Sequence, residues 1–381
     1  MPDPVHDNGR AKVLMVGPLP PPIGGVANFV KNINAKFSSN EKYELKIFRI
    51  GTRAEDESHP LIPFRDMKRF LGFVKDFKKC DPDIVHVHSS AYYSFLRSFP
   101  YMFWTRYFSH ARLVVHFHSG LFGKFYHGTH PPVRYLVRKM ITSADAVIVT
   151  SPSWKKLIKE ISGREQGIHP IANGFDPSIF HPMDKKESRK MIGLPENGRI
   201  LVTVGYLENV KGHRFLIQAM RDVVNKFDDA RAFIVGSGTL EEPLLAQVEE
   251  LGLKGKVNFM EGGQTSETIA LWINSSDLFV LPSLNEGNPT VLFESLGCGR
   301  PFLGTRVGGI PDVVNSEKVG LLCEPSDPHG LAIAIITALQ RTWDERYISA
   351  YAKQYTWESI ATKLMEIYGQ TLEKDDSSRV P

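Results

Sequence analysis

The stretch Leu281-Pro-Ser-Leu-Asn-Glu286-Gly-Asn-Pro-Thr-Val-Leu-Phe-Glu294 decides the fold. The apolar run Leu278–Leu281 leads into it and predicts a buried strand. Asn288 suits a helix N-cap and Pro289 the first helical position, so we expect a strand, a tight loop and then a helix. That helix would start in the loop, with unpaired N–H groups and the positive end of its dipole at the top of a sheet. Such a helix start predicts a site for an anion.

Two carboxylates flank this predicted anion site. Glu286 and Glu294 stand with seven residues between them. A carboxylate repels phosphate, but it accepts hydrogen bonds from hydroxyls that surround a phosphate. Hydroxyls beside phosphates indicate a sugar and a ribose. The segment therefore predicts a nucleotide-sugar pocket.

Strand and helix patterns alternate along the chain. The strand-like runs of the first half are Lys12–Val16, Leu45–Ile50, Ile84–His88, Leu113–Phe117 and Ala146–Thr150. Those of the second half are Ile200–Val204, Ala232–Val235, Val257–Phe259, Leu278–Leu281 and Pro301–Gly304. This alternation predicts an α/β protein with two doubly wound, Rossmann-like parallel sheets. Ligands of such sheets bind beyond the carboxyl ends of the strands, and we expect the two sheets to face a central cleft.

The length of 381 residues is too great for one hydrophobic core, which predicts two domains. The segment Ala172–Pro182 contains Asn-Gly and two prolines, a composition typical of an extended connector. We expect an acceptor-binding domain at 1–175 and a donor-binding domain at 176–356. A last helix, at about 357–372, would belong to the first domain.

The composition is that of an ordinary globular protein, with 42% hydrophobic and 23% charged residues. The cysteines Cys80, Cys298 and Cys323 are scattered and predict neither a disulfide framework nor a zinc site. A reducing, cytoplasmic location fits best. The polar N-terminus does not resemble a signal peptide, and no apolar run approaches the ~20 residues of a spanning helix.

Charge is distributed unevenly between the halves. Residues 1–180 hold 25 Lys and Arg against 15 Asp and Glu, whereas residues 181–381 hold 21 against 27. The basic half predicts contact with an anionic partner, either the inner face of the plasma membrane or a phosphate-bearing acceptor. The alternative is a pair of ordinarily solvated surfaces.

Two loops of the first half carry candidate binding groups. Gly24 and Gly25 open the first helix, where a backbone without side chains can approach a bulky anion. His118 ends a strand and could bond a sugar hydroxyl or the reacting region, although a structural role is an alternative. With His116 and the histidines of Ile84–His88 it could also form a metal site, but carboxylate ligands are missing, and we expect no metal.

Two loops of the second half are further candidates. Lys211 follows a strand and could neutralise a diphosphate, or it could be a surface lysine at a turn. Gly236-Ser-Gly238 resembles half of a dinucleotide fingerprint, with Glu241 in place of the third glycine. It predicts either a nucleoside lying against this loop or a plain strand-to-helix turn.

In this order, the motifs resemble those of the retaining glycosyltransferases of family GT4, which have the GT-B fold. The resemblance spans about residues 12–370. It is carried by the spacing of Glu286 and Glu294, the glycine-rich loop Pro21–Val26, His118, Asn173–Asp176 with Phe180, Gly308–Asp312 and the helix at Trp357. The resemblance implies a hexosyltransferase that uses a UDP- or GDP-linked sugar, has no tightly bound cofactor and requires no metal.

The resemblance also implies roles for single residues. Glu294 would bind the ribose hydroxyls, Glu286 the hydroxyls of the donor sugar, and Lys211 would balance charge on the leaving diphosphate. His118 and Lys211 would act with Glu286 in catalysis. The implied donor-binding residues are Gly24, Gly25, Tyr206, Gly236, Gly238, Gly287, Asn288, Pro289, Thr290 and Glu294.

The chain departs from the family at Tyr206, where an arginine is usual. A tyrosine hydroxyl can bond phosphate but brings no charge. Either Lys211 carries more of the charge balance, or Arg214 substitutes, or the donor differs.

The expected function is transfer of a sugar to a hydroxyl of a glycan or lipid-linked acceptor, in cell-surface polysaccharide or glycolipid synthesis. The segments 65–75 and 97–108 mix apolar and basic residues, which suits either a peripheral membrane surface or two core-facing helices. The rival functions are a nucleotide-sugar epimerase or hydrolase on the same fold, and a non-catalytic sugar-nucleotide-binding or scaffold protein. Scattered basic residues argue against nucleic-acid binding, and incomplete glycine fingerprints argue against a nicotinamide dehydrogenase.

Overall fold

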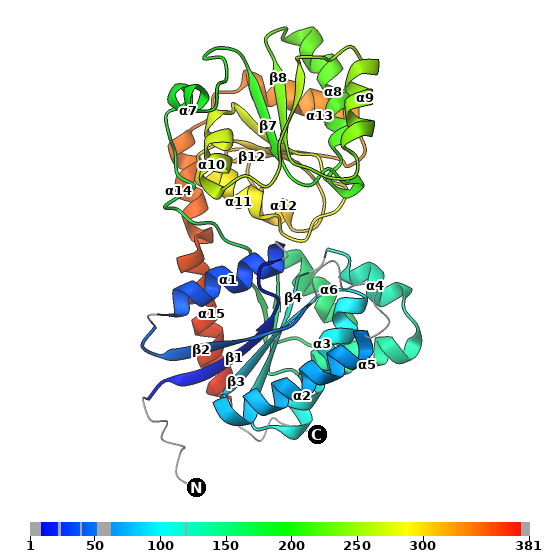
Figure 1. Ribbon diagram of the computed structural model, residues 1–381, viewed down its shortest axis with the longest axis vertical. Helices are drawn as coiled ribbons and strands as arrows, with labels where there is room; N and C mark the ends of the chain where they lie inside the picture. The colour runs from blue at the N-terminus through cyan, green and yellow to red at the C-terminus, as the bar shows by residue number, and fades with distance from the viewer. Residues whose placement is uncertain (1–8, 22–23, 39, 52–61, 119, 375–381) are drawn as a thin grey trace. The chain divides into compact units, whose positions relative to one another are not determined.

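The computed structural model describes residues 9–21, 24–38, 40–51, 62–118 and 120–374. The chain forms two compact units. Unit 1 comprises the described part of Met1–Asn173 together with that of Trp357–Pro381, and unit 2 is Gly174–Thr356. Each unit contains one six-stranded parallel sheet with helices between its strands (Figure 1). The predicted fold class is therefore confirmed.

The sheet of unit 1 has the order β2-β1-β3-β4-β5-β6, and all its neighbouring strands are parallel. The strands are β1 (Ala11–Gly17), β2 (Tyr43–Arg49), β3 (Ile84–Ser89), β4 (Arg112–Phe117), β5 (Ala146–Val149) and β6 (Ile168–Pro170). The central strands β3, β4 and β5 are buried along their whole length, which explains their apolar runs. Strand β6 was not predicted, because three residues are too few to show a pattern.

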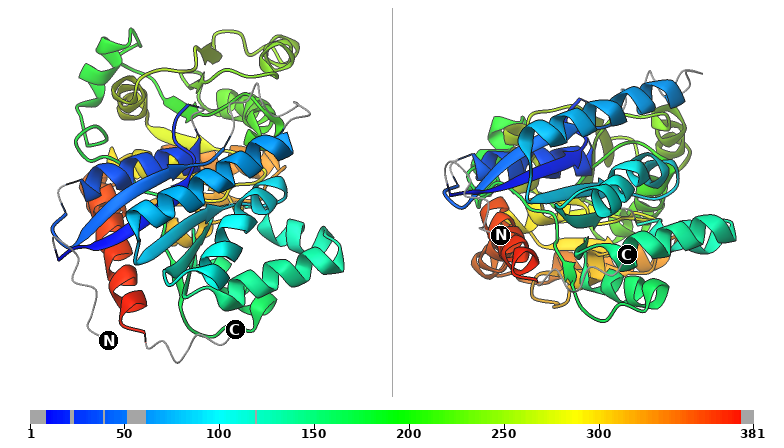
Figure 2. Two further views of the ribbon diagram at one scale, coloured as in Figure 1. Left: turned by 60° about the horizontal axis from the view of Figure 1, so that its bottom comes forward. Right: turned by 90° about the horizontal axis from the view of Figure 1, so that it is seen from below.

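Helices cover both faces of this sheet. They are α1 (Gly25–Phe37), α2 (Ile62–Cys80), α3 (Tyr93–Phe108), α4 (Phe122–Gly128), α5 (Pro131–Ser143), α6 (Pro152–Ser162) and α15 (Trp357–Leu372). Helices α1 and α15 lie on one face, and α2 to α6 pack on the other (Figures 1 and 2). Buried Trp357 and Leu364 of α15 share a core with Val13 and Met15 of β1. The C-terminal helix is thus built into unit 1.

The apolar side chains of α2 are divided between the core and the surface. Met67 and Leu71 are 59% and 62% exposed, whereas Phe73 and Phe77 are buried. The ring centroids of Phe77 and Trp104 lie 4.7 Å apart, because the buried face of α2 is turned toward α3. Large aromatic side chains gain more by burial here than Met67 and Leu71 would.

The sheet of unit 2 has the order β12-β11-β10-β7-β8-β9. Its strands are β7 (Ile200–Val204), β8 (Arg231–Val235), β9 (Val257–Met260), β10 (Leu278–Leu281), β11 (Phe302–Thr305) and β12 (Gly320–Cys323). Strand β12 was not predicted, since it is short and begins with glycine. The helical segments are α7 (Lys185–Met191), η2 (Asn209–Lys211), α8 (His213–Lys226), α9 (Glu241–Glu250), α10 (Ser266–Ser275), α11 (Thr290–Gly297), α12 (Ile310–Val313), α13 (Pro328–Gln340), α14 (Glu345–Ala352) and η3 (Lys353–Tyr355).

Each sheet has one point where the strand order reverses. In unit 1 this point lies between β1 and β3, and in unit 2 it lies between β7 and β10. Loops diverge to opposite faces there and leave a crevice at the carboxyl ends of the strands, where ligands of such folds bind. The loops that follow these four strands therefore hold the candidate sites.

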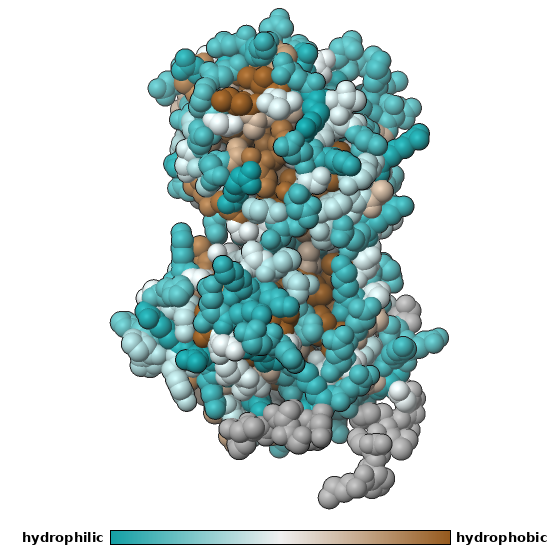
Figure 3. Space-filling model, turned by 180° about the vertical axis from the view of Figure 1, so that it is seen from behind, coloured by the Kyte–Doolittle hydropathy of each residue, from teal (hydrophilic) through white to brown (hydrophobic). Residues whose placement is uncertain are grey.

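The surface is mainly hydrophilic when seen from behind, with hydrophobic side chains gathered in each unit (Figure 3). Within the described ranges, none of the helices combines the length and the apolar character needed to cross a bilayer.

Candidate functional site

The two loops at the reversal point of unit 2 are joined through their backbones. The amide of Leu284, after β10, donates to the carbonyl of Val210, after β7, at 2.7 Å. Gly212 has a φ of +68°, and a Cβ there would lie 2.0 Å from the carbonyl oxygen of Pro282. Only glycine permits this left-handed turn at such close approach. The turn holds Lys211 against the loop that carries Glu286.

Lys211 and Glu286 form an ion pair, with Nζ and Oε1 2.8 Å apart. The hydroxyl of Ser283 donates to the same Oε1 at 2.7 Å. Glu286 is only 8% exposed, so the lysine and the hydroxyl offset the cost of burying its charge. Within the described residues Oε2 of Glu286 accepts no hydrogen bond, which leaves this oxygen for a ligand.

A third loop supports Glu286 from the side of β11. Gly308 has a φ of +54°, and a Cβ there would lie 1.8 Å from the carbonyl oxygen of Glu286. The amide of Gly309 donates to the carbonyl of Gly287 at 2.9 Å. The turn at Gly308 and Gly309 therefore holds the backbone carbonyls of Glu286 and Gly287 in place.

The predicted start of α11 is wrong by one residue. The helix begins at Thr290, and Pro289 is its N-cap, with φ −70° and ψ 127°. A proline fixes its own φ, but here its ψ is extended, so it lies outside the helix. No side-chain hydrogen bond caps α11. The backbone N–H groups of its first turn remain directed at the loop that contains Gly287 and Asn288.

Glu294 lies one turn into α11. Burial raises the pKa of its carboxyl to about 7. In the part of the chain that the structure describes, its side chain forms no hydrogen bond or ion pair. Its oxygens are therefore available to hydroxyls of a ligand. A hydroxyl that donates to the carboxylate would favour the ionised form and lower this pKa.

Gly236 and Gly238 pack tightly against the loop that follows β7. A Cβ on Gly236 would lie 1.9 Å from the carbonyl oxygen of Gly205, and one on Gly238 would lie 2.6 Å from that of Leu207. The fold of unit 2 alone thus requires glycine at both positions. Contact between this loop and a nucleoside stays a prediction.

Tyr206 presents a 54% exposed side chain, while its carbonyl accepts a hydrogen bond from buried His213 at 3.2 Å. Burial lowers the pKa of His213 to about 4, so this imidazole is neutral at pH 7. The Arg214 guanidinium lies over the Phe215 ring, 4.6 Å from its centroid. Arg214 also lines a pocket of about 230 Å³ with Glu208. That Arg214 supplies the charge of the arginine usual at position 206 stays a prediction.

Gly24 and Gly25 of unit 1 differ from the glycines of unit 2. Both are exposed, and a Cβ on either would meet no described atom within 4 Å. Gly24 is the N-cap of α1 with an extended φ of −168°, which any residue can adopt. The fold of the described residues therefore does not require glycine here, and the surrounding space can accept a ligand.

His118 belongs to a stack of four imidazoles in unit 1. Its ring centroid is 3.9 Å from that of His116, and its Nε2 shares a hydrogen bond with Nδ1 of His88 at 2.7 Å. His86 is bonded through Nδ1 to the hydroxyl of Tyr368 on α15, also at 2.7 Å. Burial lowers the pKa of His86 and His118 to about 3 and those of His88 and His116 well below 6.5. Ser119, which follows His118 in the chain, lies outside the described residues.

Three of these histidines are close enough for a metal to be considered. The ring nitrogens of His86, His88 and His116 lie within 4.8 Å of one another. Their rings are stacked, however, with angles of 27° between His86 and His88 and 11° between His86 and His116. The lone pairs lie in the ring planes and do not converge at the distance of about 2.0–2.1 Å that a zinc–nitrogen bond needs. The arrangement favours a stack of neutral imidazoles.

Ser283 is the site residue that the sequence reasoning missed. A serine three positions before Glu286 was visible, but nothing in the pattern distinguished it from an ordinary loop residue. The pairing of Lys211 with Glu286 was also invisible, because 75 positions separate them in the chain. The sheet order, which places β7 beside β10, brings them together.

Comparison with known proteins places this geometry in a family. Residues 184–355 match the family described as glycosyl transferases group 1, and residues 23–179 match glycosyltransferase family 4. The chain is 30% identical to an N-acetyl-alpha-D-glucosaminyl L-malate synthase of Bacillus anthracis, over 66% of this chain and 67% of that protein. It is 29% identical to a D-inositol 3-phosphate glycosyltransferase of Corynebacterium urealyticum, over 62% of this chain and 59% of that protein. The matches thus span about three fifths to two thirds of these relatives.

Solved structures show the same fold over nearly the whole chain. A sucrose-phosphate synthase from Thermosynechococcus elongatus has a TM-score of 0.76 at 21% identity, covering 95% of this chain and 99% of that one. Anabaena HepE, solved in complex with UDP, has a TM-score of 0.73 at 19% identity, covering 94% and 100%. These neighbours are glycosyltransferases of the GT-B fold. The chain therefore belongs to glycosyltransferase family 4, among the glycosyl transferases of group 1.

Proposed function

We propose that the chain transfers a sugar from a nucleoside-diphosphate sugar to an acceptor hydroxyl, with retention of configuration. The observation that carries this proposal is the Lys211–Glu286 ion pair at the reversal point of unit 2. A cation beside a mostly buried carboxylate offers partners for both a diphosphate and sugar hydroxyls. Glu294 on the adjoining helix offers a third partner, for the ribose.

Each donor group has a matching protein group in unit 2. The ribose hydroxyls would donate to Glu294, and hydroxyls of the sugar would donate to the open Oε2 of Glu286. The diphosphate would lie near Lys211 and the uncapped first turn of α11, which starts at Thr290. Anabaena HepE, which has a similar fold, was solved in complex with UDP and with UDP-glucose, and this supports a nucleotide of this kind.

In the proposed reaction the acceptor oxygen forms a bond to the anomeric carbon on the face that the phosphate leaves. The bond from that carbon to the phosphate oxygen breaks, and its electron pair stays on the diphosphate. The leaving phosphate takes the proton of the acceptor hydroxyl. Lys211 stabilises the charge that grows on the diphosphate, a role in which a preorganised cation contributes most. Tyr206 adds a neutral hydroxyl where an arginine would add a second charge.

Two classes of acceptor have support. A glycan or lipid-linked acceptor at a membrane surface, in polysaccharide or glycolipid synthesis, is favoured by the exposed aromatics Phe103 and Phe108 of α3. A small hydroxyl-bearing anion is favoured by the relatives, which are named for L-malate and D-inositol 3-phosphate. Sedimentation with anionic liposomes distinguishes the first class, since only a membrane-bound acceptor requires the protein to co-sediment.

A thermal-shift screen against UDP, GDP and their sugar conjugates tests the donor site. A nucleotide that binds only the native state raises the unfolding temperature. We expect one base to stabilise the wild type and to lose this effect in Lys211→Ala. Product analysis with and without an added acceptor then separates transfer from the epimerase or hydrolase alternative. Absence of any turnover with a bound donor would favour the scaffold alternative.

A further inference from the structure

His88 and His118 are joined by a hydrogen bond within the histidine stack of unit 1. Nδ1 of His88 and Nε2 of His118 lie 2.7 Å apart. His88 lies near the end of β3, and His118 directly follows the neighbouring parallel strand β4. Both side chains are therefore at the carboxyl end of the sheet, beyond which the ligands of such folds bind. The bond between them bears on what His118 offers to a ligand.

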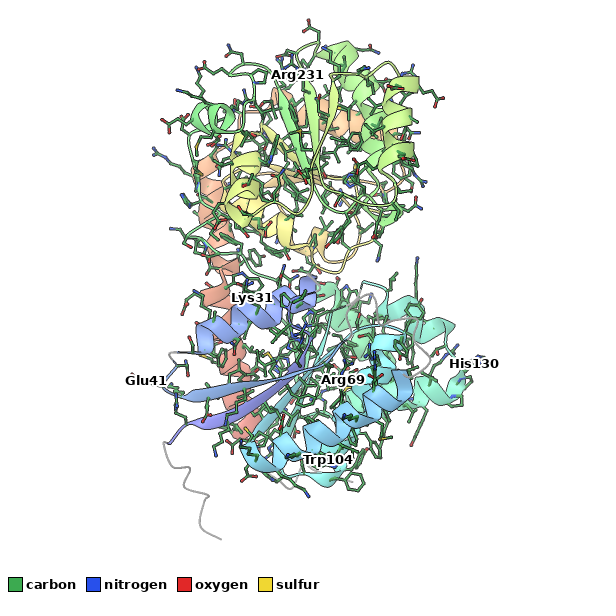
Figure 4. The ribbon with its side chains drawn as sticks, in the orientation of Figure 1. Lys31, Glu41, Arg69, Trp104, His130 and Arg231 are labelled. Carbon is green, nitrogen blue, oxygen red and sulfur yellow. The ribbon has the colours of Figure 1, made fainter. Side chains whose placement is uncertain are left out.

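The ring of His118 is held on several sides. His116 stacks on it, with ring centroids 3.9 Å apart and an angle of 29° between the rings. Phe29 of α1, the helix marked by Lys31 in Figure 4, contacts it edge-on, with centroids 5.4 Å apart. Phe29 is buried, whereas Lys31 is exposed on the outer side of the same helix. Together with the hydrogen bond, these contacts restrict rotation of the ring, so its two nitrogens keep fixed directions.

Each of the two hydrogen-bonded rings carries one proton at pH 7. Burial holds the pKa of His88 well below 6.5 and lowers the pKa of His118 to about 3, so both imidazoles are neutral. A neutral imidazole has one N–H donor and one bare acceptor nitrogen. The hydrogen bond between the rings can therefore run in two directions, and each direction fixes the tautomer of both rings.

The second nitrogen of His88 favours one of these directions. Nε2 of His88 is buried and has no hydrogen-bond partner among the described residues. If Nδ1 of His88 accepted the bond, Nε2 would carry a buried N–H group without an acceptor, and such orphaned donors are rare in folded proteins. If Nδ1 donates the bond, Nε2 is a bare nitrogen and no donor is orphaned. The hydrogen-bond network therefore assigns the proton to Nδ1 of His88 and, because Nε2 of His118 accepts, also to Nδ1 of His118.

Nδ1 of His118 is the ring nitrogen left for a ligand. His118 is only partly buried, and within the described part of the chain this nitrogen has no hydrogen-bond partner. In the Nδ1–H tautomer it donates a hydrogen bond and cannot take up a proton. This agrees with the proposed reaction, in which the leaving phosphate, and not a histidine, takes the proton of the acceptor hydroxyl.

We propose that His88 is a positioning residue, whose Nδ1–H group holds His118 in the tautomer that donates a hydrogen bond from Nδ1 to an oxygen atom of the bound substrate. The inference rests on the proposed function, since it takes a sugar-bearing substrate as the ligand of His118. A hydroxyl or phosphate oxygen has the lone pair that such a donor needs. An ammonium group in the same place has none, so a substrate that carries one there would be rejected.

The tautomer of His118 can be measured directly by NMR. Long-range proton–nitrogen spectra of the full chain with isotope-labelled histidine show which ring nitrogen carries the proton. The signals of His118 are identified by their absence in His118→Gln. We expect the proton of His118 on Nδ1 at pH 7 in the wild type. A proton on Nε2 would overturn the proposal, and this measurement requires no substrate.

Two substitutions of His88 separate positioning from packing. His88→Asn keeps an N–H donor in the place of Nδ1 but loses the ring, whereas His88→Phe keeps a ring in the stack but loses the donor. We expect His88→Phe to lower kcat/KM about tenfold or more, and His88→Asn to retain most of the wild-type value. A role in packing alone predicts the reverse order, and that result would overturn the proposal.

His116→Phe is the matched control. It makes the same exchange in the same stack, but at a ring whose two nitrogens are buried without a partner among the described residues. It should keep the wild-type kcat/KM and leave the proton of His118 on Nδ1. Equal losses of kcat/KM in His116→Phe and His88→Phe would show that the stack acts only through packing, which would contradict the role given to His88.

The kinetic measurements separate this inference from the proposed function. The substrate is whichever UDP- or GDP-linked sugar stabilises the wild type most, and release of the nucleoside diphosphate is followed. If neither UDP, GDP nor their sugar conjugates stabilise the wild type, the proposed function fails, while the NMR spectra still test the tautomer. If the wild type turns over a sugar nucleotide and His88→Phe does so at the same rate, the positioning role fails and the proposed function stands. If His88→Phe does not fold, His88→Asn provides the test, because a move of the His118 proton to Nε2 in this variant would overturn the proposal.

Discussion

Replacement of Glu294 by glutamine should make the ligand-free protein more stable and the donor site weaker. The carboxyl has an ordinary pKa of 4.5, which burial raises to about 7 in the folded state. Below pH 4.5 both states are protonated and the group costs nothing. As the pH rises from 4.5 to 7, only the unfolded state ionises, so the native state loses stability. Above pH 7 the full loss persists.

The size of this loss follows from the separation of the two pKa values. A separation of about 2.5 pH units at 1.36 kcal/mol per unit corresponds to about 3 kcal/mol. Glu294 is only partly buried, and solvent reduces the effect, so we expect a gain of about 1–3 kcal/mol for Glu294→Gln at pH 8. The gain should vanish at pH 4.5.

Urea unfolding at pH 4.5, 6 and 8 measures the free energy of unfolding, with Glu249→Gln on the exposed side of α9 as the control. The same proteins are then titrated with the stabilising nucleotide. The wild type should gain stability with nucleotide, and Glu294→Gln should gain little, because the neutral amide offers a single acceptor oxygen and no charge-assisted bond to the ribose hydroxyls. Equal nucleotide binding in both proteins would refute the ribose assignment. Equal stability at pH 8 would refute the burial argument.

Three further predictions follow from the contacts. Lys211→Ala should lower kcat/KM on the order of 10²-fold, with recovery in Lys211→Arg, and unchanged kinetics would exclude charge balance by this residue. Gly308→Ala should lower both the free energy of unfolding and the affinity for the donor, because its Cβ would lie 1.8 Å from the carbonyl oxygen of Glu286. Gly252→Ala is the control, since Gly252 has a similar φ of +67° but open space around it. This control should lower the free energy of unfolding by only about 1–2 kcal/mol and leave donor affinity intact. The histidine stack should make unit 1 unstable in acid, because its buried imidazoles have pKa values below the ordinary 6.5. The free energy of unfolding should be highest above pH 6.5 and fall as the pH drops toward 3. The fall should be at most about 1.4 kcal/mol per pH unit for each histidine. Urea unfolding of the wild type between pH 7 and 4.5, compared with His116→Phe, tests this, and a flat profile in both would contradict it.

The sequence pattern was most informative for the strands of the two sheets. Ile200–Val204 and Leu278–Leu281 were predicted with the bounds that the structure shows. Both are apolar and bounded by turn residues, because parallel strands are buried on both faces. Strands β6 and β12 lie at sheet edges and are short, so local pattern carried no signal for them. Strand order decides which loops meet, and it depends on contacts between distant segments.

The start of α11 shows a different limit. Asn288 and Pro289 are each frequent at helix starts, and local preference favoured placing the helix one residue early. In the structure the helix begins one residue later. The amide of Gly309 donates to the carbonyl of Gly287, and Gly308 packs against the carbonyl of Glu286, so these contacts hold the loop in place. A contact from the next strand thus overrides the local preference by one residue. The first residue of a helix can therefore depend on contacts from distant segments, which the local sequence does not reveal.

The glycines of the chain show why residue type alone does not identify a site. Gly236 belongs to a segment that resembles half of a dinucleotide fingerprint, and Gly308 belongs to a motif of the family, yet backbone atoms within unit 2 require glycine at both positions. Gly24 and Gly25 look no different, but their surroundings in the described residues are open. An alanine at Gly24 should therefore leave the stability of unit 1 unchanged while it narrows the approach to the start of α1. Loss of activity without loss of stability in Gly24→Ala would show that this glycine contacts a ligand. Loss of activity in Gly236→Ala would not distinguish a ligand contact from damage to the fold of unit 2.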